Sequence, residues 1–368
     1  MLQDLPTPCL ILDEARMLAN IARFDAQAAR LGVATRPHLK TAKCIEVARL
    51  MTAGGTAPVT VSTLEEARRF GAAGFGDILY AVGIAPQKLA EAAALRRAGC
   101  DLVVILDSVQ QAEAAAAAGV PAMIEIDSDG HRGGLAPGAS EIVEVGASLA
   151  RAGLLRGVMT HAGESYAAKG EAGQARHAEL ERRAVVAAAE ALRAAGLDCA
   201  AVSVGSTPTA HGARDLEGVT EVRAGVYVFF DLVMAGIEVC TFDDIALSVL
   251  ATVIGHRPDK GWILVDAGWM ALSRDRGTAA QAVDQGYGVV CDAAGRVLPD
   301  LIVGATSQEH GVLHRRAGSS APLPELAVGA RVRILPNHAC ATAAQHDRYR
   351  VIRADGQGLA EWHRFGGW

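Results

Sequence analysis

The sequence lacks the features that mark nucleic-acid-binding and membrane proteins. Its 368 residues contain no basic block, and the formal net charge of −6 gives no sign of binding to nucleic acid or to an anionic membrane. No uninterrupted apolar run approaches about 18 residues, and the N-terminus, MLQDLPTPCL, has neither a positive n-region nor an apolar h-region. We therefore expect a cytoplasmic protein whose partner is a small molecule.

Two further patterns are missing. The seven cysteines are scattered and odd in number, which fits reduced thiols better than a disulfide framework. No GxGxxG follows a predicted strand, which argues against a doubly wound dinucleotide-binding sheet. The hydrophobic content of 51% allows a large core, and the length suits one large domain with a smaller one.

Short β-branched runs alternate with alanine-rich helical stretches over much of the chain. After a strand at 8–12 and a helix to about Leu31, eight runs predict strands at 33–40, 59–62, 78–82, 102–106, 122–127, 155–161, 201–204 and 220–224. Eight strands with intervening helices suit a (β/α)8 barrel, whose active site gathers at the C-terminal strand ends. We favour this barrel over an open sheet and assign it to residues 9–235.

The pattern changes beyond about Leu232 to strands without regular helices. Strands are predicted at 245–256, 262–266, 288–291 and 331–335, separated by turn signals such as RPDKG and DAAG. This pattern predicts a C-terminal antiparallel β domain over residues 236–368, joined by residues 1–8. Its unusual polar segments are DAGW, SQEHG and LPNHAC.

The segment TRPHLKTAKC, residues 35–44, carries the lysine that most needs explanation. If 33–40 is a strand, alternation places Arg36, His38 and Lys40 on one face. Cationic neighbours and partial desolvation lower the pKa of a lysine and yield a neutral amine that can attack a carbonyl. A surface strand end with solvated charges is the alternative interpretation, and Lys43 is the alternative lysine.

Polar residues follow several predicted strand ends. Asp127 precedes SDGHRGG, which holds Arg132, and Thr160 precedes HAGESY, which holds His161 and Tyr166. In the same loops, we interpret Asp129 and Glu164 as turn-forming residues. The gathering of such residues at one rim of the barrel indicates a binding site.

A possible phosphate site follows the strand at 201–204. Gly205, Ser206 and Thr207 offer backbone N–H groups and two hydroxyls, and Gly225 and Tyr227 follow the next strand. An ordinary Gly-Ser-Thr-Pro turn and a core tyrosine would have the same sequence.

His338 and Cys340 are the candidate metal ligands. In an extended segment, residues two apart face the same way, so an imidazole and a thiolate could bind one cation, and this pairing suits zinc. Two protein ligands leave positions for water and substrate, as a Lewis-acid site requires. An isolated His-x-Cys pair is more often a coincidence than a metal site. Here the motifs of the predicted barrel support the metal-site interpretation.

These motifs resemble those of the fold-type III pyridoxal-phosphate enzymes, with an alanine racemase-like barrel and a C-terminal β domain. The chain is most similar to the branch of D-serine dehydratase, D-threo-3-hydroxyaspartate dehydratase and D-threonine aldolase, and SVGSTPTA, EVRAGVYVFFDLVM and DAGWMALSRDRGT look closest to the hydroxyaspartate enzyme. Dehydratases of this branch carry His-x-Cys, as here, whereas aldolases carry His-x-Asp. Glu164 stands where the serine dehydratases tend to have His.

The resemblance implies the cofactors and the activity. Pyridoxal 5′-phosphate (PLP) would bind Lys40, with other contacts from His38, Arg132, His161, Tyr166, Gly205, Ser206, Thr207, Gly225 and Tyr227. His338 and Cys340 would bind a divalent metal, zinc first, with manganese, cobalt or nickel as alternatives. The implied reaction removes water from a D-3-hydroxy amino acid and then deaminates it, turning D-threo-3-hydroxyaspartate into oxaloacetate and ammonia in a homodimeric enzyme. A D-serine dehydratase, a metal-dependent D-threonine aldolase, a racemase and a non-catalytic cofactor carrier remain the alternatives.

Overall fold

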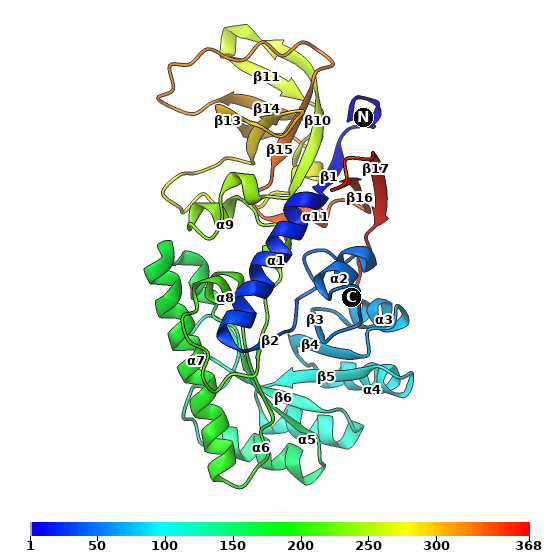
Figure 1. Cartoon of the computed structure of the whole chain (residues 1–368), viewed down its shortest axis with the longest axis vertical. Helices are drawn as coiled ribbons and strands as arrows, with labels where there is room; N and C mark the ends of the chain where they lie inside the picture. Colours follow the sequence, from blue (N-terminus) through cyan, green and yellow to red (C-terminus); the bar gives the residue numbers. More distant parts are fainter. Residues whose placement is uncertain (1) are drawn as a thin grey trace. The chain divides into compact units, whose positions relative to one another are not determined.

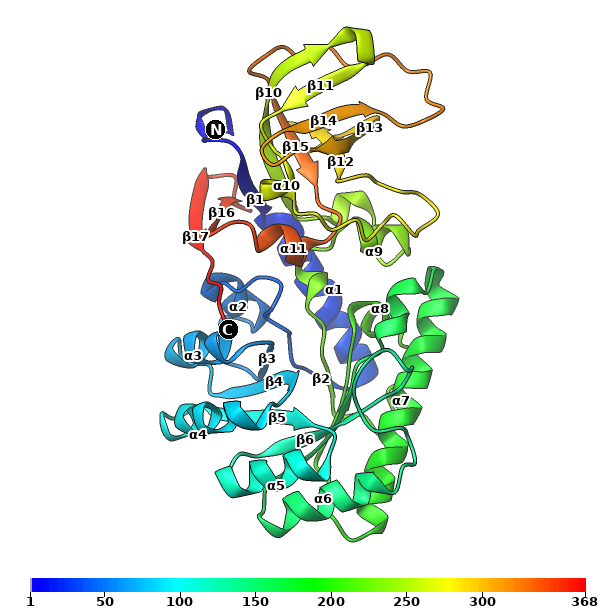
Figure 2. The same ribbon diagram turned by 180° about the vertical axis from the view of Figure 1, so that it is seen from behind.

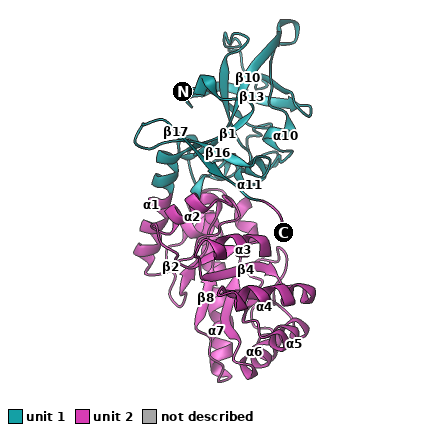
Figure 3. Ribbon diagram, turned by 90° about the vertical axis from the view of Figure 1, so that its right-hand side faces the viewer, with its two compact units in different colours: residues 1–20, 228–365 teal, residues 21–227, 366–368 magenta. Residues whose placement is uncertain are grey.

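The computed structural model describes residues 2–368, which form two compact units (Figure 3). Unit 1 comprises the described residues up to Asn20 and residues 228–365. Unit 2 comprises residues 21–227 and 366–368. Helix α1 (Glu14–Leu31) contributes its first residues to unit 1 and the remainder, from Ile21, to unit 2.

Unit 2 is built on an eight-stranded parallel sheet in the order β2-β9-β8-β7-β6-β5-β4-β3. Its strands are β2 (Ala34–Thr35), β3 (Val59–Val61), β4 (Asp77–Gly83), β5 (Asp101–Leu106), β6 (Ala122–Ile126), β7 (Leu155–Thr160), β8 (Ala201–Val204) and β9 (Glu221–Val222). The segment after β2 also pairs with β3: Leu39 N–H donates to Thr60 O (2.8 Å), and Thr60 N–H donates to Pro37 O (2.9 Å). This pairing closes the sheet, so the predicted alanine racemase-like barrel is confirmed.

Helices lie along the outside of these strands (Figure 1). They are α2 (Ile45–Met51), α3 (Leu64–Ala72), α4 (Leu89–Arg97), α5 (Val109–Ala118), α6 (Glu141–Arg151), α7 (Gly170–Ala194) and α8 (Thr207–Gly212). Local sequence sets several of their ends. Thr63 and Ser108, for example, accept the N–H groups of Glu66 and Gln111 and so cap α3 and α5.

The barrel core contains one buried residue from each of β4, β5, β6 and β7: Leu79, Ile105, Met123 and Met159. Close packing of β7 on β8 depends on Gly157, whose φ is +147°. A Cβ there would lie 1.9 Å from the carbonyl oxygen of Ala201, so no other residue fits.

Unit 1 is built on a nine-stranded sheet in the order β11-β14-β13-β12-β15-β10-β1-β16-β17. The strands are β1 (Cys9–Asp13), β10 (Leu247–Arg257), β11 (Trp262–Val265), β12 (Val289–Asp292), β13 (Val297–Thr306), β14 (Gly311–Arg315), β15 (Arg331–Leu335), β16 (Arg348–Ile352) and β17 (Leu359–His363). Its neighbours pair antiparallel except β1 with β16. Three short helices, α9 (Leu232–Gly236), α10 (Trp269–Leu272) and α11 (Ala339–Ala343), complete the unit (Figure 2).

Two details differ from the sequence-based picture. β2 ends at Thr35 and Lys40 lies in a turn, so the strand predicted over 33–40 is too long. β13, β14, β16 and β17 were not predicted, because β13 is interrupted by proline and glycine and the other three have only five residues with charged side chains among them. The domain boundaries at 9–235 and 236–368 stay a prediction; β1 pairs with β10 and β16 of unit 1.

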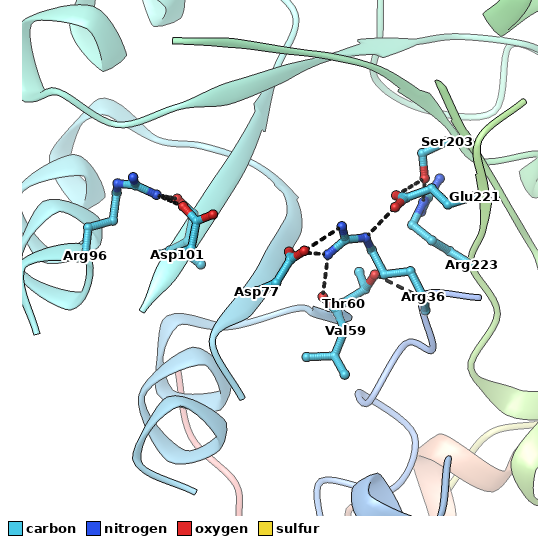
Figure 4. A network of polar contacts seen from close by, with 10 residues as sticks. Arg36, Val59, Thr60, Asp77, Arg96, Asp101, Ser203, Glu221 and Arg223 are labelled. Atoms are coloured by element: carbon cyan, nitrogen blue, oxygen red, sulfur yellow. Dashed lines mark hydrogen bonds and ion pairs between the residues drawn. The ribbon is translucent and has the colours of Figure 1, made fainter. Parts of the chain in front are cut away.

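A buried ionic network crosses the barrel (Figure 4). The guanidinium of Arg36 lies between two carboxylates, 2.8 Å from Glu221 and 2.6 Å from Asp77. Glu221 also accepts the hydroxyl of Ser203 (2.7 Å), and that hydroxyl accepts Nε of Arg223 (2.8 Å). Arg36 therefore faces the acidic network of β4 and β9, and the expectation that it joins Lys40 on one strand face is wrong.

Removing Arg36 tests this network. The side chains of Arg36 and Glu221 are only 13% and 11% exposed, so Arg36→Leu would leave a buried carboxylate without its partner. We expect a loss of about 3 to 5 kcal/mol in the free energy of unfolding. Arg96→Leu, which removes a pair with the 63% exposed Asp101, should cost about 1 kcal/mol or less. Equal losses in urea denaturation would contradict the proposed role of Arg36.

Candidate active site

Lys40 lies in the turn that follows the His38–Thr60 bridge. Its backbone N–H donates to Nδ1 of His38 (3.4 Å), which fixes that imidazole beside the turn. The alternative lysine, Lys43, has a different environment, because its ammonium forms an ion pair with the buried Glu66 (3.0 Å). Lys43 thus has a carboxylate partner, whereas Lys40 lies in the turn beside the imidazole of His38.

Five basic groups gather around this turn: Lys40, His38, Arg132, His161 and Arg223. Burial lowers the pKa of His38 well below its usual value, and the charges of Lys40 and Arg223 lower it further. Burial, with the charges of Arg132 and Lys40, lowers the pKa of His161 to about 3. Both imidazoles are therefore neutral at physiological pH, while the surrounding charges favour an anionic ligand.

The orientation of His161 follows from its hydrogen bond to the loop after β8. Its Nδ1 lies 2.7 Å from the carbonyl oxygen of Gly205, and because a carbonyl only accepts, Nδ1 carries the proton. Nε2 is then an acceptor. Tyr166, in the 3-10 turn Gly163–Ala167, lies with its ring centre 6.1 Å from that of His161.

The predicted phosphate loop fits its role only in part. The N–H of Gly205 donates to Glu181 (2.9 Å), and the N–H of Ser206 donates to the Thr209 hydroxyl (3.1 Å). The Ser206 hydroxyl also caps α8. The buried Thr207 hydroxyl, in contrast, has no hydrogen-bond partner among residues 2–368, so it is the group here that most needs an external ligand.

Gly225 and Tyr227 follow β9. A Cβ on Gly225 would lie 3.0 Å from the carbonyl oxygen of His38, so glycine at this position lets the chain after β9 pack closely on the Lys40 turn. The ring of Tyr227 stacks on Phe24 at 4.2 Å, as a core residue would. Its buried hydroxyl has no partner in the described part of the chain, and burial raises its pKa well above the usual value.

The region therefore fits a phosphorylated, anionic cofactor. A partly buried lysine, neutral imidazoles, two arginines and two unpartnered buried hydroxyls match the donors that such a group requires. The fit rests on the chemistry of these donors.

The candidate metal ligands belong to unit 1. His338 directly precedes α11, and Cys340 lies in the first turn of that helix, so the extended segment expected from alternation is wrong. The two side chains still meet, since they form a hydrogen bond. Among residues 2–368, no three His, Cys, Asp or Glu side chains are grouped so that they could hold a metal ion.

Carboxylates orient this pair. Nδ1 of His338 lies 2.7 Å from Asp275, which leaves Nε2 for a metal. Burial opposes protonation of His338, but the hydrogen bonds to Asp275 and Cys340 outweigh it and raise the pKa to about 11. The buried Asp231 accepts the N–H of Ala339 (2.9 Å), between the two candidate ligands.

Sequence reasoning gave no role to Asp275 and Glu181, and it recognised Arg223 only as one of the polar residues at the predicted strand ends. Asp275 lies inside DAGWMALSRDRGT, a segment used only for the resemblance. Glu181 lies in the long alanine-rich α7 and gives no local signal. Asp129, interpreted as a turn former, accepts the N–H of His131 in its own loop (3.3 Å), and it also accepts the N–H of Glu164 from the loop after β7 (2.8 Å).

Comparison with known proteins places the chain in a family. A model described as "Alanine racemase, N-terminal domain" matches residues 12–233, and one described as "Putative serine dehydratase domain" matches residues 246–352. The D-threo-3-hydroxyaspartate dehydratase of Delftia sp. is 53% identical, with 100% of this chain and 99% of that protein aligned. The chain belongs to the family of this dehydratase.

Other members of the dehydratase family agree with this assignment. D-serine dehydratase of Dictyostelium discoideum is 30% identical over 97% of this chain and 95% of its own. The solved structure of the Delftia dehydratase superposes with a TM-score of 0.96 at 53% identity, covering 100% of this chain and 99% of that one. The resemblance drawn from the motifs is confirmed.

Two solved variants of a D-threo-3-hydroxyaspartate dehydratase bear on the candidate metal site. One replaces a histidine by alanine, and another, in a metal-free form, replaces a cysteine by alanine two residues further on. The metal-free form implies that this relative binds a metal. His338 and Cys340 have the same spacing in this chain.

The buried imidazoles predict a loss of stability in acid. The pKa of His161 is lowered to about 3, and burial lowers that of His211, on α8, to about 4. The unfolded chain, with imidazole pKa values near 6.5, binds more protons, so stability present above pH 6.5 falls as the pH is lowered towards these values. Each imidazole contributes up to about 1.4 kcal/mol per pH unit. In urea denaturation, His211→Gln should lose less stability than the wild type between pH 6.5 and 4.5; an unchanged slope would contradict this.

Proposed function

We propose that this protein is a PLP- and divalent-metal-dependent dehydratase of a D-3-hydroxy amino acid. The preferred substrate is D-threo-3-hydroxyaspartate, and the products are oxaloacetate and ammonia. The observation that carries the proposal is the presence in one chain of the Lys40 turn with its basic cluster and the His338–Cys340 pair held by Asp275. The 53% identity to a dehydratase of that substrate supports the choice.

Lys40 would bind PLP through its amine. His38, Arg132, His161 and Tyr166 would surround the ring, while Gly205, Ser206, Thr207, Gly225 and Tyr227 would lie on the phosphate side. Bound PLP supplies an electron sink for negative charge at the substrate Cα. The protein would orient the cofactor. The neutral imidazole of His161, held as the Nδ1–H tautomer by the carbonyl of Gly205, would lie against the ring, and Arg132 and Arg223 would supply positive charge.

The reaction then requires removal of the Cα proton and cleavage of the bond to the 3-hydroxyl. The Lys40 amine, which would hold PLP, would also serve as the base that removes the Cα proton. The 3-hydroxyl leaves as hydroxide, a poor leaving group, and a cation on His338 and Cys340 would stabilise its developing charge as a Lewis acid, worth several kcal/mol. The resulting enamine takes up water and releases ammonia, so the water lost in elimination is balanced by the water used in hydrolysis.

Zinc is the metal that an imidazole and a thiolate favour, with manganese, cobalt or nickel as alternatives. Asp275 would hold His338 through the nitrogen that does not bind the metal. A homodimer and a cytoplasmic location also belong to the proposal, on resemblance and composition. No helix among residues 2–368 is long and apolar enough to span a bilayer.

Two related activities are the alternatives. A D-threonine aldolase would break the Cα–Cβ bond and release glycine and an aldehyde, but His-x-Cys is the dehydratase pattern. A D-serine dehydratase would give pyruvate and ammonia, but Glu164 stands where those enzymes tend to have His. Assays of D-serine, D-threonine and the 3-hydroxyaspartate isomers, with products identified, separate the three; glycine as the main product would overturn the proposal.

Replacing the lysine tests the cofactor assignment. Lys40→Ala should lose the near-visible absorbance band of covalently bound PLP and at least about 10²- to 10⁴-fold in rate, because a covalent anchor and a base disappear together. Lys43→Ala, which removes the partner of Glu66, should keep the band. A band that survives in Lys40→Ala and disappears in Lys43→Ala would mean that the wrong lysine was chosen.

Removing the metal tests the Lewis-acid role. Chelation or Cys340→Ala should abolish elimination while PLP stays bound, since the metal is proposed to act on the leaving hydroxyl. Zinc should restore the chelated enzyme but not Cys340→Ala. Asp275→Asn should weaken metal binding about 10- to 100-fold without removing a ligand.

Cys9→Ala, a change in β1 of the same unit, is the matched control and should keep both metal and activity. Full elimination by the metal-free enzyme would remove the metal from the mechanism.

A further inference from the structure

Glu181 is a buried carboxylate that joins two loops of the barrel. It lies on α7 and is 2% exposed. Its Oε1 accepts the backbone N–H of Ala162 (3.1 Å), in the loop after β7, and the N–H of Gly205 (2.9 Å), in the loop after β8. The Thr209 side chain adds a third hydrogen bond. One oxygen atom thus fixes the spacing of two loops that are 43 residues apart in sequence (162 to 205).

Other contacts tie the same loops together. His161 donates to the carbonyl oxygen of Gly205 (2.7 Å), and the hydroxyls of Ser165 and Ser206 lie 2.8 Å apart. Gly205 has φ +152°, and a Cβ there would lie 1.8 Å from the carbonyl oxygen of Arg223. Gly205 is therefore held at its N–H by Glu181, at its C=O by His161 and at its Cα by β9.

We propose that Glu181 is a positioning residue for the cofactor, which sets the distance between the His161–Tyr166 loop and the Gly205–Thr207 loop. This inference rests on the proposed function, in which the first loop borders the PLP ring and the second its phosphate. Ring and phosphate belong to one rigid ligand, so binding requires the two loops at a fixed separation. Glu181 supplies that separation before the ligand arrives, and this lowers the ordering cost of binding.

Two conservative variants distinguish the effect of the length of the Glu181 side chain from the effect of its charge. Glu181→Asp keeps the charge but is one methylene shorter, so it cannot reach both N–H groups from α7. Glu181→Gln keeps the reach and an oxygen that accepts both hydrogen bonds, but it is neutral. Glu190→Gln, at an exposed position of the same helix, is the matched control.

The readouts are PLP affinity of the apoenzyme and hydrogen–deuterium exchange of residues 161–168 and 205–212 in the absence of PLP. We expect Glu181→Asp to bind PLP about tenfold or more weakly and to exchange faster in both segments together, as the loss of hydrogen bonds to a charged acceptor requires. Glu181→Gln should stay within about threefold of the wild type, with exchange nearly unchanged. Glu190→Gln should match the wild type in both measurements.

Any other order overturns the proposal. If Glu181→Gln binds PLP more weakly than Glu181→Asp does, the effect comes from the charge of the side chain and not from its reach. If exchange becomes faster in only one of the two segments, Glu181 does not couple the loops. Failure of both variants to fold, while Glu190→Gln folds, would make Glu181 a stability residue only. If the wild type itself does not bind PLP, the proposed function fails, whereas the exchange measurement on the unliganded protein still decides whether Glu181 couples the loops.

Discussion

The backbone pairing of residues 37–39 with Thr60 is the constraint on which the candidate site depends. It joins the two ends of the parallel sheet and thereby closes the barrel. Because the pairing ends at Leu39, the chain turns at Lys40, and that side chain is placed beside the ends of β7, β8 and β9 instead of continuing along a strand. Barrel closure and the position of Lys40 are consequences of the same few hydrogen bonds.

Two arginines of this barrel have different surroundings. Arg36 is held by the carboxylates of Asp77 and Glu221, so its charge is neutralised by contact. Arg223 donates instead to neutral oxygens, the Ser203 hydroxyl and the Thr160 carbonyl. Burial lowers its pKa, and the charges of Glu221, Glu181 and Glu125 oppose that shift. The positive charge of Arg223 is therefore not neutralised by a contacting carboxylate, and it can attract an anion at the strand ends.

Much of the fold could be predicted from the sequence, because buried parallel strands and alanine-rich helices leave strong, regular signals. All eight barrel strands were expected near their observed positions. β17, at the edge of the sheet, and its neighbour β16 were missed because each has only five residues and mixes charged with apolar side chains. Candidate site residues could be named from the sequence where a motif is local, as at Lys40, His338 and Cys340, and their roles stay predictions.

Partners brought in by tertiary structure could not be predicted in this way. Nothing local links Glu181 to Gly205 or Asp275 to His338. Alternation also misled twice, at Arg36 and at Cys340, because it assumes a strand where the chain turns or enters a helix.

The start of α9 is joined to the turn that carries the candidate metal ligands. Asp231 caps α9 by accepting the N–H of Met234, and its second oxygen accepts the N–H of Ala339. The first free N–H groups of α9, at Leu232 and Val233, donate to the carbonyls of Pro336 and Asn337. The helix end and the ligand turn thus satisfy each other's backbone groups, so they must open as one cooperative segment. The residence time of a metal in this turn would then be limited by the local unfolding of α9, a helix that contacts no ligand of its own.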